Sequence, residues 1–172
     1  EPIKEPIKEP IKEPVTNFSE LSINITNLLT KDEKKDGGIF FTPKSIIKHD
    51  IDYIFSIKSD IKTILEPSCG SCEFINYIDK RITGCEIDGV EMNEKIYEKI
   101  KDLKFKNNVN LFNEDFLKFK LSKKYSLICG NPPYFVYKKE TISDEYKKYI
   151  TGRANIYLIF ILKCIDLLEA LQ

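Results

Sequence analysis

The sequence has little histidine, no long apolar run and no excess of charge of either sign. A membrane-spanning helix needs roughly 20 consecutive apolar residues, and no run approaches that length, so we expect a soluble protein with no membrane partner. Formal net charge is zero, from 27 basic and 27 acidic side chains, so global charge predicts no polyanionic partner. A chain of 172 residues with 42% hydrophobic content favours one domain with a buried core.

The sequence also has too few candidate ligands for a tetrahedral metal site. Cys69-Gly-Ser-Cys72 could supply two ligands, but a tetrahedral zinc site needs four, and the chain has no second such pair and a single histidine, His49. We therefore expect no metal, and we expect His49 on a helix surface. The odd number of cysteines, five, and the lack of a secretory signal favour reduced, buried thiols in an intracellular protein.

The chain lacks the two common glycine-rich phosphate loops. Neither Gly-x-Gly-x-x-Gly nor a loop ending in Lys-Ser or Lys-Thr follows the predicted strand 62–65. Instead that strand ends in Glu66-Pro67-Ser68-Cys69-Gly70, and a helix is predicted from about Phe74. The acidic Glu66 disfavours pyrophosphate and suits a ligand that carries an ammonium group.

Basic residues are concentrated locally. From Lys95 to Lys163 there are 15 Lys or Arg against 7 Asp or Glu. This excess of positive charge indicates either a region that binds a polyanion or an ordinary lysine-rich surface. Tyr137, Tyr146 and Tyr149 lie among these lysines. They either contact nucleic acid or belong to a surface loop.

The chain divides into three parts. Residues 1–14 repeat Glu-Pro-Ile-Lys, and a proline at every fourth position predicts an extended, solvated tail without helix or strand. Apolar spacing in residues 15–36 predicts a helical segment. Residues 37–172 form the predicted folded domain.

Strands and helices alternate in that domain, which predicts an α/β, Rossmann-like fold. Four strands are expected, at residues 62–65, 81–86, 109–112 and 125–129. Asp88 is predicted to cap a helix over residues 89–103. A nearly all-apolar helix over residues 155–168 is predicted to be largely buried against the sheet.

Acidic residues stand at three predicted strand ends: Glu66, Glu86 and Asp115. Parallel strands bind ligands at their carboxyl ends, and the acidic residue that ends the second strand binds ribose hydroxyls in such folds. Three acidic strand ends therefore indicate a nucleoside-like ligand with an amine and hydroxyl groups.

Two further motifs flank this arrangement. Thr42-Pro43 predicts a helix start, with Thr42 as the N-cap and Pro43 in the first helical position, and its exposed N–H groups could face a carboxylate or phosphate. Gly130-Asn131-Pro132-Pro133-Tyr134 follows the fourth strand, where two prolines stiffen the chain. A polar amide beside an aromatic ring suits a nucleobase or a planar amide.

In combination, these motifs resemble those of the S-adenosylmethionine-dependent N6-adenine DNA methyltransferases of the Asn-Pro-Pro-Tyr type, over roughly residues 37–168. The resemblance implies a Rossmann-like methyltransferase domain with S-adenosylmethionine as cofactor. It implies no metal. Its implied cofactor-binding residues are Phe40, Thr42, Pro43, Glu66, Pro67, Ser68, Cys69, Gly70, Glu86, Ile87, Asp115, Phe116 and Asn131.

The same resemblance assigns roles within that set. Phe40, Thr42 and Pro43 would hold the methionine carboxylate, and Glu66 with its loop would hold the methionine amine. Glu86 would accept from the ribose hydroxyls and Ile87 would pack on the adenine, whereas Asp115 would accept from the adenine amine and Phe116 would stack near that ring.

The implied catalytic residues are Asn131, Pro132, Pro133 and Tyr134. The Asn131 side-chain oxygen and the Pro132 carbonyl would accept from the amine of the target adenine. Tyr134 would stack on that base once it has left the duplex. DNA is therefore the implied partner.

Members of the family carry further strands, a second aromatic clamp and a target-recognition domain after the buried helix. None follows Gln172 in this sequence, so we expect an incomplete sheet of four strands with its fourth strand as an exposed edge. Unaided DNA methylation is then not expected, and a second chain that completes the sheet is a candidate partner.

Two other functions remain open on the sequence alone. Glutamine methyltransferases that act on release factors also carry Asn-Pro-Pro-Tyr, although they have a glycine-richer cofactor loop and a separate helical domain. The chain could also be a truncated, inactive remnant that keeps the fold and the cofactor site.

Overall fold

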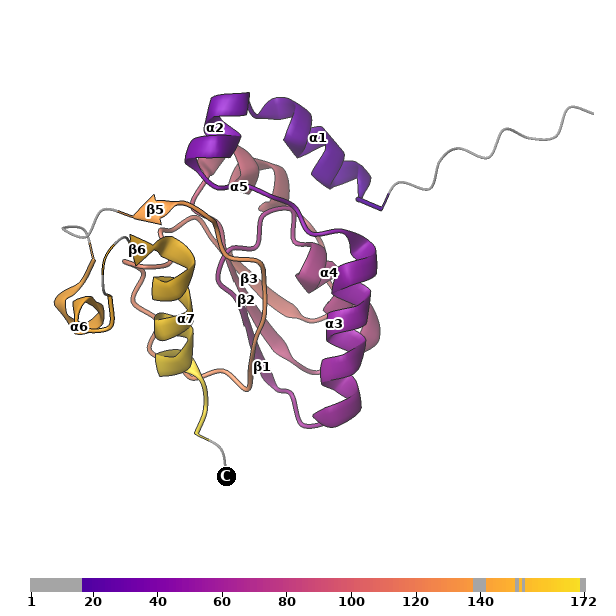
Figure 1. Ribbon diagram of the computed structural model, residues 1–172. Coiled ribbons are helices and arrows are strands. Elements are labelled where there is room, and N and C mark those ends of the chain that lie inside the picture. The colour runs from indigo at the N-terminus through magenta and orange to yellow at the C-terminus, as the bar shows by residue number, and fades with distance from the viewer. Residues whose placement is uncertain (1–16, 138–141, 151, 153, 171–172) are drawn as a thin grey trace, which may run out of the picture.

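The computed structural model describes residues 17–137, 142–150, 152 and 154–170 (Figure 1). Three helices precede the first strand: α1 (Glu20–Leu28), α2 (Lys31–Asp36) and α3 (Lys44–Ile57). The predicted helical segment 15–36 is thus two helices. Thr30 separates them, because its side chain accepts from Glu33 N while the Glu33 carboxylate accepts from Thr30 N, a capping box that starts α2. The predicted tail, residues 1–14, lies outside the described residues.

A four-stranded parallel sheet forms the centre of the molecule, in the order β3-β2-β1-β4. Its strands are β1 (Thr63–Glu66), β2 (Glu86–Val90), β3 (Asn108–Phe112) and β4 (Leu127–Ile128). The predicted α/β, Rossmann-like class is confirmed. The strand order changes direction at β1, so the carboxyl ends of β1 and β4 border the crevice where such sheets bind ligands.

The second strand does not lie where the sequence predicted it. Arg81 is the last residue of α4 (Glu73–Arg81), and β2 begins at Glu86 rather than ending there. Glu86 pairs with Thr63, at the start of β1. Glu86 and Ile87 therefore stand at the amino end of the sheet, opposite the ligand edge.

The caps of two helices also differ from prediction. Helix α5 (Glu94–Ile100) is capped by Asn93, whose side chain accepts from Ile96 N, and not by Asp88. Helix α3 has no cap from Thr42. The Asn17 carbonyl accepts from Lys44 N and the Asn17 side chain accepts from Ser45 N, so a distant residue satisfies the first amides of α3.

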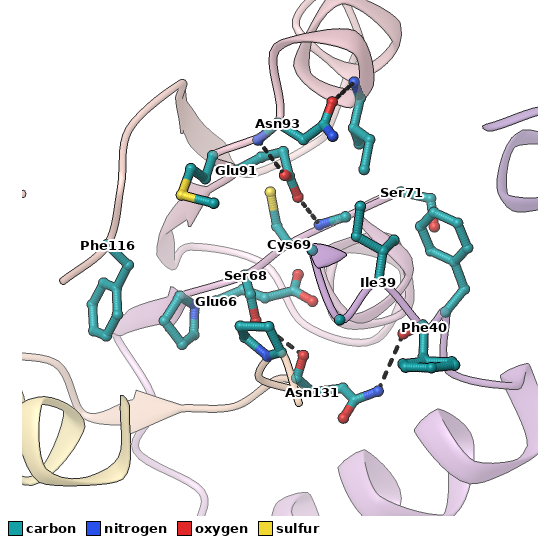
Figure 2. A pocket seen from close by; sticks show the side chains of 18 of the residues that line it. Ile39, Phe40, Glu66, Ser68, Cys69, Ser71, Glu91, Asn93, Phe116 and Asn131 are labelled. Carbon is teal, nitrogen blue, oxygen red and sulfur yellow. Dashed lines mark hydrogen bonds between the residues drawn. The ribbon is translucent and has the colours of Figure 1, made fainter. Parts of the chain in front are cut away.

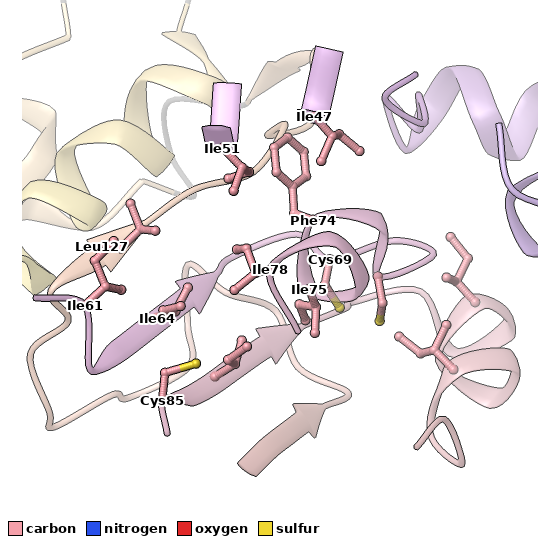
Figure 3. Packing of buried hydrophobic residues seen from close by; sticks show 14 of the residues in the cluster. Ile47, Ile51, Ile61, Ile64, Cys69, Phe74, Ile75, Ile78, Cys85 and Leu127 are labelled. Carbon is pink, nitrogen blue, oxygen red and sulfur yellow. The ribbon is translucent and has the colours of Figure 1, made fainter. Parts of the chain in front are cut away.

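Two cores cover the two faces of the sheet, because neighbouring strand residues point to opposite faces. Ile64 packs with α3 and α4 in the cluster shown in Figure 3, whereas Leu65 packs with α7 (Ile156–Leu167) in a second cluster. A Cβ added to Gly89 would lie 2.7 Å from Ile75 Cδ1. A glycine in β2 therefore lets α4 pack closely on the sheet.

Helix α7 is only partly buried, which corrects the prediction of a largely buried helix. Ile156, Ile159, Phe160 and Leu167 are buried, while Leu158, Ile161 and Ile165 form an exposed apolar face. The chain that leaves α7 pairs beside β4: Tyr125 N donates to Leu167 O, and Glu169 N donates to Tyr125 O. At Tyr125 the predicted open edge is therefore covered.

Beyond the Asn-Pro-Pro-Tyr segment, a short antiparallel ladder joins β5 (Val136–Tyr137) to β6 (Ala154–Asn155), with α6 (Asp144–Lys147) between them. Among the described residues, no helix combines the length and apolar character needed to cross a bilayer.

Candidate active site

A cleft of about 470 Å³ opens at the carboxyl edge of the sheet (Figure 2). This volume is in the range of small-molecule sites. Of the residues predicted from the sequence, it is lined by Phe40, Thr42, Glu66, Pro67, Ser68, Cys69, Gly70, Asp115, Phe116, Asn131 and Pro133. Residues from the first, third and fourth strand ends thus meet in one place.

Glu66, the last residue of β1, is the most unusual group in the cleft. Glu66 is 2% exposed, and its Oε2 atom is buried with no hydrogen-bond partner among the described residues. Burial raises the pKa of this carboxyl well above its ordinary value, and the neighbouring Cys72 raises that pKa further. A buried carboxyl oxygen of this kind is available to accept from a donor on a ligand.

The loop after Glu66 is hydrogen-bonded to the Asn131 segment. Ser68 Oγ donates to Asn131 O at 3.0 Å. Gly70 has φ +50°, where an added Cβ would come within 3.1 Å of Phe41, so glycine is needed there. Cys69 and Cys72 are buried free thiols, and no cluster of metal-ligating side chains occurs among the described residues.

The second strand brings Glu91 to the cleft, and sequence reasoning missed this residue. Glu91 directly follows β2, is 9% exposed, and accepts from Gly70 N at 2.9 Å and from Asn93 N at 2.7 Å. Burial raises the pKa of the Glu91 carboxyl. The adjacent Met92 also lines the cleft.

Glu86, in contrast, makes an ion pair with Lys123 at 2.8 Å and accepts from Asn110 at 3.2 Å, outside the cleft. The sequence does hold a signal for Glu91. An apolar strand residue, an acidic residue and another apolar residue occur twice, as Cys85-Glu86-Ile87 and as Val90-Glu91-Met92. Glu86, in the first of the two, is the residue predicted above as the acidic strand end.

Asp115 and Phe116 follow β3 and both line the cleft. Asp115 Oδ1 accepts from Leu117 N at 3.0 Å, and Asp115 Oδ2 lies 3.2 Å from Lys118 Nζ. Phe116 is buried, with its ring centroid 4.9 Å from that of Phe160 in α7. An acceptor and an aromatic ring therefore stand side by side at the third strand end.

The Asn131 segment lies along the rim of the cleft. Asn131 Nδ2 donates to Phe40 O at 3.2 Å, which fixes the orientation of the amide (Figure 2). An added Cβ on Gly130 would lie 3.3 Å from Glu66 Cγ. Glycine at this position therefore allows the segment to pass close to the buried carboxylate.

Tyr134 does not line this cleft but borders a second one. Its ring is 49% exposed and lies 5.9 Å from the ring of Tyr157. Gly38 has φ +58°, and an added Cβ would lie 2.7 Å from Tyr134 N. The loop that contains Gly37 and Gly38 therefore packs closely against the backbone of the Asn-Pro-Pro-Tyr segment, a contact that the sequence did not predict.

The remaining sequence candidates fall into three groups. Pro43 precedes α3, next to the lining residue Thr42. His49 is exposed on α3, as predicted. Of the three tyrosines proposed for nucleic acid, Tyr146 is instead buried and donates to Asp166 at 2.9 Å, Tyr149 is exposed, and the side chain of Tyr137 lies outside the described residues.

The sequence matches a known protein family. Residues 46–171 match the family described as Eco57I restriction-modification methylase. These residues include the Glu66 loop, the Glu91 strand end and the Asn131 segment.

Two viral proteins are similar over most of the chain. Modification methylase CviBIII of Paramecium bursaria Chlorella virus NC1A is 34% identical over 152 residues, which cover 88% of this chain and 40% of that protein. Type II methyltransferase M.CvrRI of Paramecium bursaria Chlorella virus XZ-6E is 35% identical over 150 residues, which cover 86% and 37%. The chain thus spans about two fifths of these relatives.

A solved structure supports the fold. A crystal structure from Listeria monocytogenes, described as a putative class I S-adenosylmethionine-dependent methyltransferase, aligns with a TM-score of 0.57 at 16% identity. The alignment covers 87% of this chain and 47% of that one.

Proposed function

Because the chain belongs to the Eco57I restriction-modification methylase family, a family of S-adenosylmethionine-dependent DNA methyltransferases, we propose that it carries the catalytic site for methylation of the N6 amine of adenine in DNA. The observation that carries this proposal is the position of Asn131. Its amide is fixed by Phe40 O, its carbonyl is held by Ser68, and it lies at the rim of the cleft that contains Glu66.

The residues of the cleft fit S-adenosylmethionine, which supplies the activated methyl group when bound. The unpartnered Oε2 of Glu66 suits the ammonium of the methionine moiety. Phe40 and Thr42 line the same cleft and are the candidates for the carboxylate end, with Pro43 behind them at the start of α3.

The nucleoside end fits the other two strand ends. Glu91, at the end of β2, takes the ribose role that the sequence gave to Glu86, and Met92 takes the packing role given to Ile87. Asp115 supplies an acceptor for the adenine amine and Phe116 supplies an aromatic contact. We therefore assign ribose binding to Glu91.

Asn131 and Pro132 would activate the target amine. The exocyclic nitrogen of adenine is a weak nucleophile because its lone pair is delocalised into the ring. Acceptors on both of its hydrogens favour a pyramidal nitrogen with a localised lone pair. Since Asn131 Nδ2 donates to Phe40 O, the Asn131 Oδ1 is the amide atom that can accept from the substrate, together with the Pro132 carbonyl. Fixed acceptors of this kind act by positioning and electrostatics.

Tyr134 would hold the target base. Its exposed ring stands two residues after Pro132, on the outer side of the rim, where a base flipped from the duplex could stack on it.

A methyl-transfer assay tests this proposal. Labelled S-adenosylmethionine is supplied with an adenine-containing duplex, and N6-methyladenine is measured by mass spectrometry. The incomplete sheet predicted from the sequence argued against unaided methylation, but most of the predicted cofactor residues and Asn131 line one cleft. We therefore expect labelling of adenine that falls at least about 100-fold in Asn131→Ala, a loss typical of removing a fixed acceptor at the reacting atoms. Asn108→Ala, at an exposed position at the start of β3 and outside both clefts, is the matched control.

Other substrates give the opposite result. The same assay with an adenine-containing RNA and with a release-factor peptide that contains glutamine separates the substrate classes. Labelling of RNA or of glutamine without labelling of DNA would contradict the proposal.

A further inference from the structure

A second cleft, of about 660 Å³, lies between the two N-terminal helices and the end of the Asn-Pro-Pro-Tyr segment. Ile39, Phe40 and Phe41 line both clefts, so the two clefts adjoin at this segment. We call the second cleft the α1–α2 groove. It is lined by Phe18, Ser22, Ile23, Thr26, Asn27, Lys31, Lys34, Lys35, Ile39, Phe40, Phe41 and Tyr134.

Aromatic rings form one side of the α1–α2 groove. Phe40 is 64% exposed, Tyr134 is 49% exposed and Phe18 is 36% exposed. Apolar side chains that gather at a solvent-exposed groove mark an interaction site. Aromatic rings spaced along a groove also provide surfaces on which unpaired bases can stack.

Among the described residues, the charged side chains that line the groove are those of three lysines. Lys31, Lys34 and Lys35 share one face of α2 because residues three and four apart are neighbours on a helix. Lys34 Nζ donates to Thr26 O at 3.2 Å, whereas Lys31 and Lys35 are exposed.

The acidic residues of α2 do not oppose this charge within the groove. Glu33 lines the first cleft instead and is held there by Lys95 of α5, at 2.5 Å. The sequence Lys-Asp-Glu-Lys-Lys-Asp is neutral overall, but its lysines line the groove and its acidic residues do not, which gives the groove a basic lining.

We propose that the α1–α2 groove binds the DNA strand that carries the target adenine, a proposal that rests on the function proposed above. A nucleotide next to the target would place its base against Phe18 or Phe40 and its phosphates near Lys31 and Lys35. Tyr134 is one of the residues that line the groove. Its position favours DNA over another polyanion, because the DNA strand must pass this ring to present its base to Asn131.

The test is DNA binding as a function of salt. Binding of a fluorescein-labelled, adenine-containing duplex is measured by anisotropy for the wild-type chain and for Lys31→Gln/Lys35→Gln. Each lost phosphate contact lowers the slope of log affinity against log salt by about 1, so we expect the slope to fall by about 2. Lys58→Gln/Lys80→Gln, which changes exposed lysines at the amino end of the sheet, should leave the slope unchanged.

A stacking variant gives an independent readout. Phe18→Ala should weaken DNA binding about fivefold or more with the salt slope unchanged, since base stacking is not an ionic contact. Thermal melting and titration with S-adenosylmethionine check that each variant keeps its fold and its cofactor site.

The outcomes separate the groove from the proposed function. If the wild-type chain methylates DNA while the groove-lysine variant keeps the wild-type affinity and slope, the groove proposal is wrong and the function stands. If the wild-type chain neither binds nor methylates DNA, the proposed function and the groove proposal are both refuted.

Discussion

At the scale of single residues, the buried carboxylate of Glu66 dominates the site. Its side chain is almost fully buried, and Oε2 has no partner within the described chain. A buried group of this kind costs stability when it is charged. The free protein therefore carries a local instability that a cationic ligand would relieve.

This instability predicts how stability depends on pH. Burial raises the pKa of folded Glu66 well above its unfolded value of 4.5. The stability that the protonated carboxyl contributes is therefore fully present below about pH 4.5 and is lost as pH rises towards the folded pKa. We expect the melting temperature of the ligand-free wild type to fall relative to Glu66→Gln as pH rises above about 4.5, and Glu66→Gln to be the more stable form at neutral pH.

Saturating S-adenosylmethionine should reverse that order, since its ammonium would stabilise the ionised carboxylate only in the wild type. Glu98→Gln, at an exposed position on α5, is the control and should show neither effect. A wild type that gains stability relative to Glu66→Gln between pH 5 and pH 8 without ligand would refute the assignment of the raised pKa.

At the scale of elements, β2 shows what the sequence could and could not predict. The ends of β1, β3 and β4 follow apolar runs bounded by polar loops, so Glu66, Asp115 and Asn131 could be placed from the sequence. Strand β2 contains Asp88 and Gly89, which favour caps and turns over strand interiors. The start of this strand was therefore predicted five residues too early.

Long-range partners explain why Asp88 is tolerated inside the sheet. It is 3% exposed, accepts from Tyr125 Oη at 2.7 Å and from Asn110 Nδ2 at 2.9 Å, and pairs with Lys123 at 2.8 Å. The partner Tyr125 is 37 residues away in the chain. Local patterns hold no signal for such a contact, nor for the Asn17 side chain that caps α3.

Removing the Tyr125 hydroxyl should therefore destabilise the sheet. Tyr125→Phe loses a buried hydrogen bond to a charged acceptor, which costs about 1.5–3 kcal/mol in the free energy of unfolding. Urea denaturation followed by circular dichroism measures this loss. Tyr53→Phe, at an exposed position on α3, should change the free energy by less than about 0.5 kcal/mol. Equal stability of the two variants would contradict a structural role for the Asp88 cluster.

At the scale of the whole molecule, helix α1 is hydrogen-bonded to the loop and helix that follow β1. Ser22 of α1 is 1% exposed, donates to Glu73 Oε1 at 2.5 Å and shares a hydrogen bond with Ser71 Oγ at 2.8 Å. Both partners line the first cleft. The helical segment before the sheet is therefore part of the support of the site.

Ser22→Ala should weaken this support without touching the ligand. It leaves the Ser71 hydroxyl and the Glu73 carboxylate each short of a partner, at a cost of about 1–3 kcal/mol, and we expect weaker binding of S-adenosylmethionine. Denaturation and calorimetric titration measure the two effects. Ser56→Ala, on the exposed end of α3, is the control. Unchanged affinity in Ser22→Ala would show that the cofactor loop is held by other contacts.

The central claim is that the cleft at the carboxyl edge holds S-adenosylmethionine with Glu91, not Glu86, at its nucleoside end. Calorimetric titration of the wild type, Glu91→Gln and Glu86→Gln with S-adenosylmethionine tests it most directly. We expect measurable binding by the wild type and wild-type affinity in Glu86→Gln. We expect an affinity at least about tenfold lower in Glu91→Gln, since a hydrogen bond donated to a charged acceptor contributes about 1.5–3 kcal/mol. Absence of binding by the wild type, or a loss confined to Glu86→Gln, would contradict the account.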